Sequence, residues 1–290
     1  MDSAKDYVIT TDTSSDLPVS YLEENEIGLM SLSFIINGQT YREADRIMTP
    51  QEFYSLLKSG SMAQTSQVTP AEAEALFESY LKEGLDVLHI AFSSALSGSC
   101  NSAAMAAKEL ASKYPERKIV VVDSLCASLG EGLLVHKAVE LKKSGQGMEE
   151  VAQWIEENKL QLCHYFTVDN LFHLYRGGRV TKATAFVGSM LGIKPVLKVD
   201  NEGKLVQYSK VRGRKHSLTM MVDDMERSFS DREKIAFISH GDCLEDAEYV
   251  AGLIKERMGF DNILINYVGP TIGAHSGPGT VALFFFGKER

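Results

Sequence analysis

The sequence has few of the features that mark secreted, metal-binding or membrane-spanning proteins. Its 290 residues include four cysteines that form no CxxC pair, so we expect mostly buried, reduced thiols rather than disulfides or metal ligands. No apolar run approaches the length of a membrane span, and residues 1–6 lack the apolar core of a signal peptide. We therefore expect a cytoplasmic protein without integral membrane association.

Sequence motifs for nucleotide and ester chemistry are also missing. The chain contains no G-x-x-x-x-G-K-[ST] phosphate loop, no G-x-G-x-x-G after the first predicted strand and no G-x-S-x-G serine elbow. No group of histidine, cysteine and carboxylate residues has the spacing of metal ligands. The formal charge of -9 argues against a nucleic-acid partner. The sequence therefore predicts no metal and no cofactor.

What is present is a globular composition, 44% hydrophobic and 24% charged, with strands and helices alternating along the first half. Short apolar runs predict strands, and apolar residues at helical spacing predict helices. The predicted strands are residues 7–11, 85–92 and 118–123, and the predicted helices are residues 101–113, 130–143 and 148–158. Strands joined by helices require crossover connections, so we expect a largely parallel sheet.

Local signals fix three further features of this half. Asn37-Gly38, between apolar residues 29–36 and residues 39–43, predicts a tight hairpin. Thr49 and Thr69 each begin a T-P-x-E sequence, which combines a capping box with proline at the first helical position. We therefore expect a helix to start at each threonine.

The second half changes character near residue 160. Residues 193–199 and 204–211 predict a second hairpin, and helices separate the other strands, expected at residues 162–168, 234–239, 262–268 and 281–286. This pattern predicts a mixed sheet. The expected fold is α/β with two lobes, residues 1–160 and 161–290, which together form one unit.

Four polar clusters follow predicted strands or precede predicted helices and are candidate binding segments. They are residues 12–15, the loop at 65–67, the serine-rich turn at 93–99 and the segment 269–280. The glycines and prolines of the last segment predict a defined loop that allows close approach of a ligand to the backbone.

Two of these clusters contain specific candidates. Ser97 and Gly98 precede a predicted helix whose free N–H groups favour a carboxylate or phosphate. The alternative is that Ser97 or Ser99 simply caps that helix and binds no ligand. His275 lies within the predicted loop and is a candidate ligand contact. The other histidines considered are expected to be structural: His89, His136 and His164.

The segment 194–215 carries a net charge of +5 (seven basic minus two acidic residues) inside an acidic protein. Its basic residues are Lys194, Lys198, Lys204, Lys210, Arg212, Arg214 and Lys215, and its acidic residues are Asp200 and Glu202. Most such runs are solvated surface. Because Arg176, Arg179 and Lys182 are nearby in the sequence, we instead predict a basic face for a phosphorylated ligand or an acidic partner.

Taken together, the motifs resemble one family over nearly the whole chain. DTSSDLP (residues 12–18), TSQ (65–67), SSALSG (93–98), RGGR (176–179) and HSGPG (275–279) occur in the order typical of the DegV family. The resemblance implies a two-lobed α/β protein that encloses one long-chain fatty acid between its lobes. It also implies the binding subunit of a fatty acid kinase in phospholipid metabolism. Such a subunit presents the carboxylate to a separate ATP-using subunit, similar to dihydroxyacetone kinases, and then carries the acyl phosphate.

The resemblance assigns roles to particular residues. Thr65 and Ser97 would hydrogen-bond the carboxylate, with His275 beside the same group. The predicted binding set is completed by residues of the same motifs: Ser66, Ser94 and Gly98. Residues predicted to contact the kinase subunit or the phosphate are Arg176, Arg179, Arg212 and Arg214. The stretch 183–191 is either a wall of the lipid tunnel or a packed core helix.

Two other function classes stay open at this point. The hydroxyl groups and His275 are also compatible with a Ser/His hydrolase of acyl esters or thioesters, although no acid that would orient the histidine can be named. A sensor or interaction protein, stabilised by lipid, is the third class. The leading prediction is a carrier subunit without independent catalysis.

Overall fold

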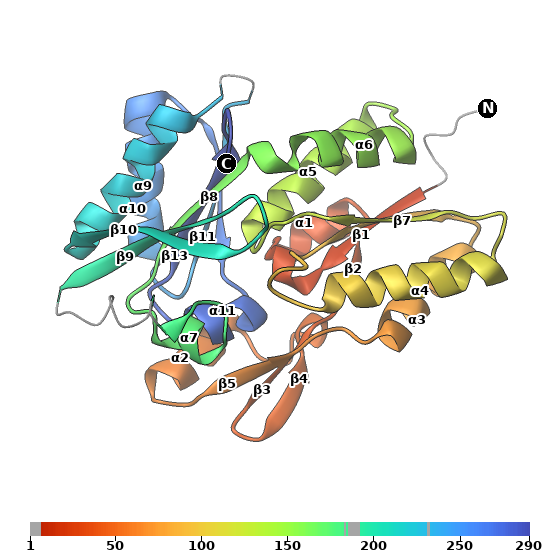
Figure 1. The fold of residues 1–290 in the computed structure, drawn as a ribbon, viewed down its shortest axis with the longest axis horizontal. Helices are drawn as coiled ribbons and strands as arrows, with labels where there is room; N and C mark the ends of the chain where they lie inside the picture. The colour runs from red at the N-terminus through yellow and green to blue at the C-terminus, as the bar shows by residue number, and fades with distance from the viewer. Residues whose placement is uncertain (1–6, 183, 185–191, 231–232) are drawn as a thin grey trace.

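In the computed structural model, which describes residues 7–182, 184, 192–230 and 233–290, the first sheet is parallel (Figure 1). Its strand order is β2-β1-β6-β7, and its strands are β1 (Tyr7–Asp12), β2 (Gly28–Met30), β6 (Asp86–Ala91) and β7 (Ile119–Asp123). Every pairing in this sheet is parallel, which confirms the expectation from the alternating pattern. Strand β1 is buried along its whole length because helices cover both faces of the sheet.

A six-stranded mixed sheet forms the core of the second half, in the order β10-β9-β8-β13-β11-β12. Its strands are β8 (Leu162–Thr167), β9 (Ile193–Val199), β10 (Leu205–Arg212), β11 (Ile235–His240), β12 (Asn262–Tyr267) and β13 (Val281–Phe286). Only β11 and β12 pair in parallel within it, and β9 and β10 form the predicted antiparallel hairpin.

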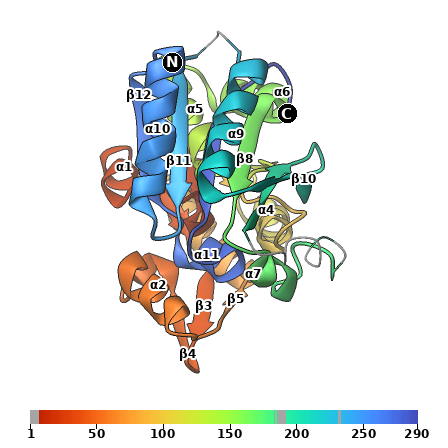
Figure 2. The ribbon, with the colours of Figure 1, turned by 90° about the vertical axis from the view of Figure 1, so that its left-hand side faces the viewer.

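Helices separate and cover the two large sheets. Helices α9 (Arg214–Ser228) and α10 (Leu244–Met258) cover the outer face of the six-stranded sheet (Figure 2). Helix α5 (Leu129–Lys143) contacts strands of both sheets and lies between them, with α6 (Met148–Asn158) beside it. Helices α3 (Pro70–Lys82) and α4 (Ser99–Lys113) cover the other face of the parallel sheet. The layers therefore run helix, sheet, helix, sheet, helix.

A third, small sheet joins the two halves at the bottom of Figure 1. It consists of β3 (Ser33–Ile36), β4 (Gln39–Arg42) and β5 (Ala63–Ser66), and α2 (Pro50–Lys58) packs beside it. Asn37 and Gly38 have φ values of 51° and 76°, as the predicted tight turn requires. Phe34 of this sheet and Tyr54 of α2 share a core with Ala274 of α11 (Pro270–Ser276).

Three local predictions were wrong. The expected single strand 29–36 is two strands in different sheets, because the chain turns where Leu32 N–H donates to Thr13 Oγ1 at 3.1 Å. Thr65 and Ser66 end strand β5 and do not lie in a loop, since they pair with β3. Part of the expected loop 269–280 is helix α11, which begins with Pro270 at its first position.

The predictions for the two helix starts and for the cysteines are confirmed. Both T-P-x-E sequences form reciprocal capping boxes at the starts of α2 and α3. The four cysteines are free, and three of them are buried. Across the described part of the chain, no helix is long and apolar enough to cross a membrane.

The predicted lobe boundary at residue 160 lies between β7 and β8, where the chain leaves the parallel sheet and enters the mixed sheet. One core cluster nevertheless includes residues of both sheets, among them Leu88 and Phe284. The boundary stays a prediction, and the shared core shows that the two halves pack as one body.

Two buried carboxyl groups support the end of β1. Asp12 Oδ2 accepts the Phe92 N–H at 2.8 Å, and Glu131 accepts the Asp12 N–H at 3.3 Å. Burial raises the pKa values of both Asp12 and Glu131 above the usual range of carboxyl groups. Asp12 Oδ1 and His89 Nε2 have no hydrogen-bond partner and lie 4.0 Å apart. This arrangement suits a carboxyl group that keeps its proton.

We expect the stability of the wild type, relative to Asp12→Asn, to fall as the pH rises from about 4 to about 7, the pKa to which burial raises Asp12, and to level off above it. The unfolded chain ionises Asp12 above about pH 4, whereas the folded chain retains the proton, so folding binds protons. The loss should reach at most about 1.4 kcal/mol for each pH unit. Urea unfolding of both proteins across this range measures it, with the exposed Asp45→Asn variant as the control. A difference that grows with pH would contradict the proposed protonation.

Candidate functional site

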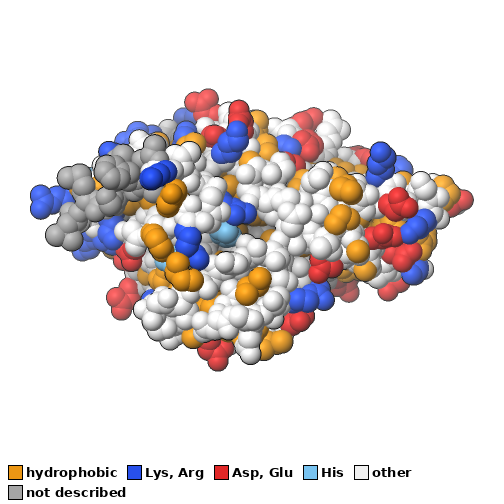
Figure 3. All heavy atoms as spheres, turned by 60° about the horizontal axis from the view of Figure 1, so that its bottom comes forward, with side chains coloured by type: hydrophobic (Ala, Val, Ile, Leu, Met, Phe, Trp, Pro, Cys, Tyr) orange, Lys and Arg blue, Asp and Glu red, His pale blue; other side chains and the backbone are white. Residues whose placement is uncertain are grey.

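A cavity of about 200 Å³ lies where the three sheets meet. This volume is far larger than the roughly 15 Å³ that a single water molecule needs, so the space is suited to a ligand. Figure 3 shows a hollow on this side of the molecule, with a histidine in it and with hydrophobic and basic side chains around it. Polar side chains line part of the cavity, and the larger part of its wall is apolar.

Three segments that are distant in the sequence contribute polar side chains to the cavity wall, and we call the group Thr65, Ser97 and His275 the polar end. Thr65 comes from the end of β5, Ser97 from the turn between β6 and α4, and His275 from the last turn of α11. Thr65 Oγ1 and His275 Nε2 are hydrogen-bonded at 2.7 Å. The structure therefore brings together all three side chains to which the resemblance assigned the carboxylate.

The protonation of His275 follows from its surroundings. Burial, followed by the nearby charges of Arg179 and Arg176, lowers the pKa of His275 to about 4, so the ring is neutral at pH 7. Its Nδ1 is buried without a partner. A buried N–H without a partner is rarer than a buried acceptor without one, so we place the proton on Nε2. Nε2–H then donates to Thr65 Oγ1, and the Thr65 hydroxyl proton is available to a ligand.

The ring of His275 is also held by close packing. A Cβ atom on Gly177 would overlap Nδ1 of His275, so only glycine allows this approach. The second glycine of the RGGR motif, Gly178, has a φ of 75° and ends the turn after α7 (Phe172–Arg176). The motif therefore shapes the site through its backbone.

Ser97 lies in a turn that the backbone fixes. Its N–H donates to Ser93 O at 3.1 Å, and its Oγ lies 3.1 Å from Ser99 Oγ. The residue in the N-cap position of α4 is Gly98, but Ser97 Oγ accepts the N–H of Ser99, the first residue of α4, at 3.3 Å. Ser97 therefore serves this helix end, as the capping alternative expected, and it also lines the cavity. Ser99 Oγ accepts the Val68 N–H at 3.2 Å and joins this turn to the TSQ motif. Gly98 also lines the cavity, and a Cβ there would overlap the side chain of Gln67.

The apolar wall comes from both halves of the chain. Its residues are Phe92, Leu96, Phe166, Leu174, Val199, Leu205, Ala282 and Phe284. Val199 and Leu205 flank the turn between β9 and β10, and Ser93 Oγ donates to Gly203 O of this turn at 2.9 Å.

Two residues of the predicted binding set do not reach the cavity. Ser66 is exposed, because successive side chains of a strand point to opposite faces and Thr65 takes the inner one. Ser94 is exposed at the outer side of its turn, where its N–H donates to Asp123 Oδ1 at 3.2 Å. We remove both from the proposed site.

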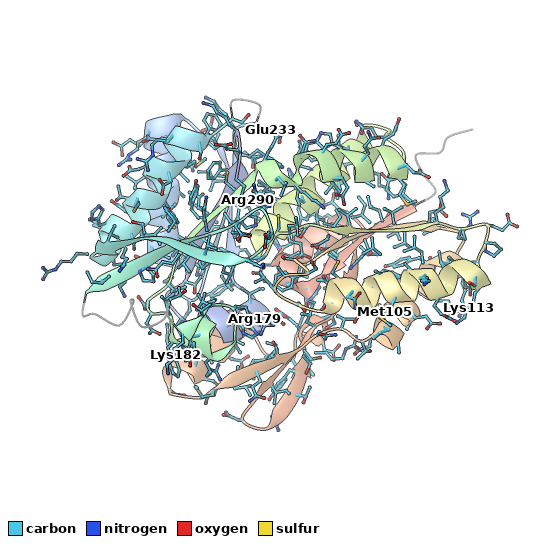
Figure 4. The ribbon with its side chains drawn as sticks, in the orientation of Figure 1. Met105, Lys113, Arg179, Lys182, Glu233 and Arg290 are labelled. Carbon is cyan, nitrogen blue, oxygen red and sulfur yellow. The ribbon has the colours of Figure 1, made fainter. Side chains whose placement is uncertain are left out.

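Of the four arginines predicted to contact the kinase subunit or the phosphate, two lie beside the cavity and two lie on the outside of the molecule. Arg179 lines the cavity beside α11, where its guanidinium donates to Leu96 O at 2.7 Å (Figure 4). Arg176 donates to Ala63 O at 2.9 Å and to Ala274 O at 3.3 Å. Both arginines therefore fix segments around the site.

On the outside of the molecule, Arg214 is ion-paired with Asp246 at 2.8 Å, whereas Arg212 at the end of β10 is exposed. The stretch predicted to form the tunnel wall or a core helix, 183–191, lies outside the described residues except for Thr184.

Sequence reasoning missed three polar residues of the cavity wall. His164 lines the cavity, although we expected it to be structural only, and Ser128 and Ser239 line it as well. A signal for His164 existed in β8, since His164 and the wall residue Phe166 are two residues apart and share a face. Nothing local identifies the serines, because they meet through tertiary packing at 2.9 Å.

The geometry gives no support to the hydrolase alternative. A catalytic histidine needs an acid or carbonyl that orients its second nitrogen, and Nδ1 of His275 has no such partner. Within the described ranges, no cluster of three or more histidine, cysteine or carboxylate residues could hold a metal ion.

Comparisons with known proteins identify one family of similar proteins, some of them solved as fatty-acid-binding proteins. Residues 6–288 match the model of a family described as "Uncharacterised protein, DegV family". A DegV domain-containing protein from Clostridium perfringens is 46% identical over 288 residues, 99% of each chain. A fatty-acid-binding DegV family protein from Thermus thermophilus has a TM-score of 0.87 and 30% identity, covering 97% of this chain and 99% of its own. A DegV family protein from Ruminococcus gnavus, solved with vaccenic acid, has a TM-score of 0.87 and 27% identity, covering 98% and 100%.

Proposed function

The chain belongs to the DegV family, and we propose that it binds one long-chain fatty acid in the cavity and presents the carboxylate to a separate kinase subunit. Thr65 and Ser97 hydrogen-bond the carboxylate, and the apolar wall encloses the tail. The observation that carries the proposal is the Thr65–His275 hydrogen bond beside Ser97, at the polar end of an otherwise largely apolar cavity.

The polar end is suited to an anion. Hydroxyl donors to a carboxylate form short, charge-assisted hydrogen bonds that offset the cost of taking the charge out of water. Thr65 has a free hydroxyl proton because His275 donates to its oxygen, and the start of α4 directs N–H groups towards Ser97. Arg179 and Arg176 add positive charge nearby, as their effect on the pKa of His275 shows.

The tail supplies most of the affinity. Each methylene group that leaves water contributes about 0.8 kcal/mol, and the wall residues Phe92, Phe166 and Phe284 are almost completely buried. A long acyl chain held between the two halves is therefore bound much more tightly than a short one. The role is that of a carrier, because His275 has the environment of a hydrogen-bond donor and not of a catalytic base.

We place docking of the kinase subunit on the basic segment 194–215. This ATP-using subunit, similar to dihydroxyacetone kinases, would convert the bound acid to an acyl phosphate in the cytoplasm. Support comes from the net charge of +5 in a protein of net charge -9, which favours an acidic partner surface. Arg212 is exposed there, whereas the charge of Arg214 is neutralised by Asp246.

We expect Arg212→Glu to lower the rate of acyl phosphate formation about ten-fold, because like charges slow the encounter of two protein surfaces. The measurement combines lipid-loaded protein, the kinase subunit and ATP, and traps the acyl phosphate with hydroxylamine. Mass spectrometry of an organic extract checks that both proteins carry the same amount of fatty acid.

The matched control is Lys108→Glu on α4, an exposed basic residue outside the segment. An equal loss in both variants would show only a general charge effect and would remove the segment from the docking surface. An unchanged rate in Arg212→Glu would contradict the assignment of this residue.

A further inference from the structure

A row of hydroxyl groups lies along one wall of the cavity, in addition to the polar end that takes the carboxylate. We call Ser128, Ser239, Ser276 and Thr280 the hydroxyl strip; all four line the cavity. An unsubstituted hydrocarbon tail forms no hydrogen bonds with polar groups, and burying such groups beside it lowers the affinity for the lipid. The strip therefore requires a separate explanation.

The strip is a continuous feature, because its residues come from adjoining segments. Ser128 precedes α5, and its Oγ lies 2.9 Å from Oγ of Ser239 near the end of β11. Gly241, just after β11, donates its N–H to Thr280 O at 2.8 Å. Ser276 ends α11, four residues before Thr280, and its buried hydroxyl has no hydrogen-bond partner.

The hydrogen bonds of the strip turn its oxygens into acceptors. When Asp16 is ionised, Ser128 Oγ–H donates to Asp16 Oδ2, and the proton between Ser128 and Ser239 then comes from Ser239. Ser239 Oγ then has two lone pairs and no remaining proton. Thr280 Oγ1–H donates to Gly277 O at 2.8 Å, which leaves its lone pairs as well.

His164 adds a further acceptor to the same wall. Its Nδ1 lies 3.2 Å from Leu162 O, an acceptor, so Nδ1 carries the proton. Burial lowers the pKa of His164 well below its usual range, and the ring is neutral. Nε2 is therefore an acceptor, and it accepts the Ala127 N–H in a long hydrogen bond of 3.4 Å.

Acceptors beside one unpartnered hydroxyl, that of Ser276, match a group on the lipid tail that both donates and accepts, the hydroxyl. From this geometry we infer that the cavity takes a long-chain fatty acid with a hydroxyl group on its chain, which donates to Ser239, Thr280 or His164. A ketone could accept from Ser276, but it is disfavoured because it would leave the acceptors Thr280 and His164 without a donor. This inference rests on the proposed fatty-acid binding and specifies the class of acid.

A ketone on the acyl chain tests the direction of the Ser128–Ser239 hydrogen bond, because a ketone oxygen can only accept. Burial and the nearby Glu43 raise the pKa of Asp16 well above its usual value. A proton on Asp16 Oδ2 would reverse the chain of hydrogen bonds and make Ser239 a donor towards the cavity. In that case a ketone would bind better than an alcohol.

The experiment compares octadecanoic acid with a positional series of monohydroxy-octadecanoic acids and the matching oxo-octadecanoic acids. Competition for delipidated protein is followed by native mass spectrometry. At least one hydroxy isomer should bind as tightly as octadecanoic acid or more tightly, and its ketone about ten-fold more weakly. Ser239→Ala should lower the preference for that isomer over octadecanoic acid about ten-fold, and Ser276→Ala tests the other end of the strip.

The matched control, exposed Ser94→Ala, should keep the wild-type preference. Weaker binding of every hydroxy isomer than of octadecanoic acid would overturn the inference, and so would a preference for a ketone. In both cases octadecanoic acid still binds and the proposed function stands. If octadecanoic acid itself fails to bind, the proposed function fails and this inference fails with it.

Discussion

Replacing both Thr65 and Ser97 with alanine should lower the affinity for a long-chain fatty acid about a hundred-fold or more. Each hydroxyl gives a hydrogen bond to a charged group, and losing one such bond to a buried partner costs about 1–3 kcal/mol. Both residues line the polar end of the cavity, and Thr65 is oriented by His275 at 2.7 Å. The double variant leaves the carboxylate with fewer donors in a water-poor site, so the two losses reinforce each other.

The chain offers unusually close controls for this experiment. Ser66 is the neighbour of Thr65 on β5, and Ser94 lies in the same turn as Ser97, yet both are exposed and outside the cavity. Ser66→Ala combined with Ser94→Ala removes the same number of hydroxyl groups and should leave the affinity unchanged. Calorimetric titration of delipidated proteins measures both. Equal affinities of the two double variants would remove Thr65 and Ser97 from the site.

Ala282→Phe should shorten the acyl chain that the cavity accepts. Ala282 lies on β13 beside Phe166 and Ser239 of the neighbouring strands, and it lines the cavity. A phenyl ring there displaces about four methylene groups of the tail, each worth about 0.8 kcal/mol, so affinity for octadecanoic acid should fall about two-hundred-fold. Tetradecanoic acid should lose much less, because its tail ends before the blocked region.

The change in chain-length preference separates a blocked tunnel from a damaged fold. A misfolded variant loses affinity for acids of every length, whereas a blocked tunnel spares the shorter ones. Ala95→Phe adds the same ring at an exposed position of the serine-rich turn and is the control. If folded Ala282→Phe bound octadecanoic acid as the wild type does, the tail would not lie in this part of the cavity.

Sequence patterns predicted those elements whose signals are local. The T-P-x-E sequences, the Asn37-Gly38 turn and the alternation of strands and helices each depend on residues within one element or turn. The motif order led to Thr65, Ser97 and His275, and the structure places these three in the wall of one cavity. The cavity itself, which requires all three sheets, could only be expected through the family resemblance.

The predictions that were wrong concern features that tertiary packing determines. Nothing local shows that residues 29–36 divide between two sheets, because the division depends on the Leu32 N–H reaching Thr13. The glycine-rich segment around His275 looked like a loop, yet Gly273 is helical because α11 packs closely against Tyr54. Ser66 and Ser94 were included because they belong to the motifs, although their side chains face away from the ligand site. Ser128, Ser239 and His164 have no shared sequence signal.

The most direct test of the account is a crystal structure of the protein with octadecanoic acid bound. We predict one carboxylate oxygen within hydrogen-bond distance of Thr65 Oγ1 and one within that distance of Ser97 Oγ. The tail should run past Phe166 and Ala282 between the two large sheets. A carboxylate bound away from both hydroxyl groups, or an acyl chain lying outside this cavity, would contradict the account.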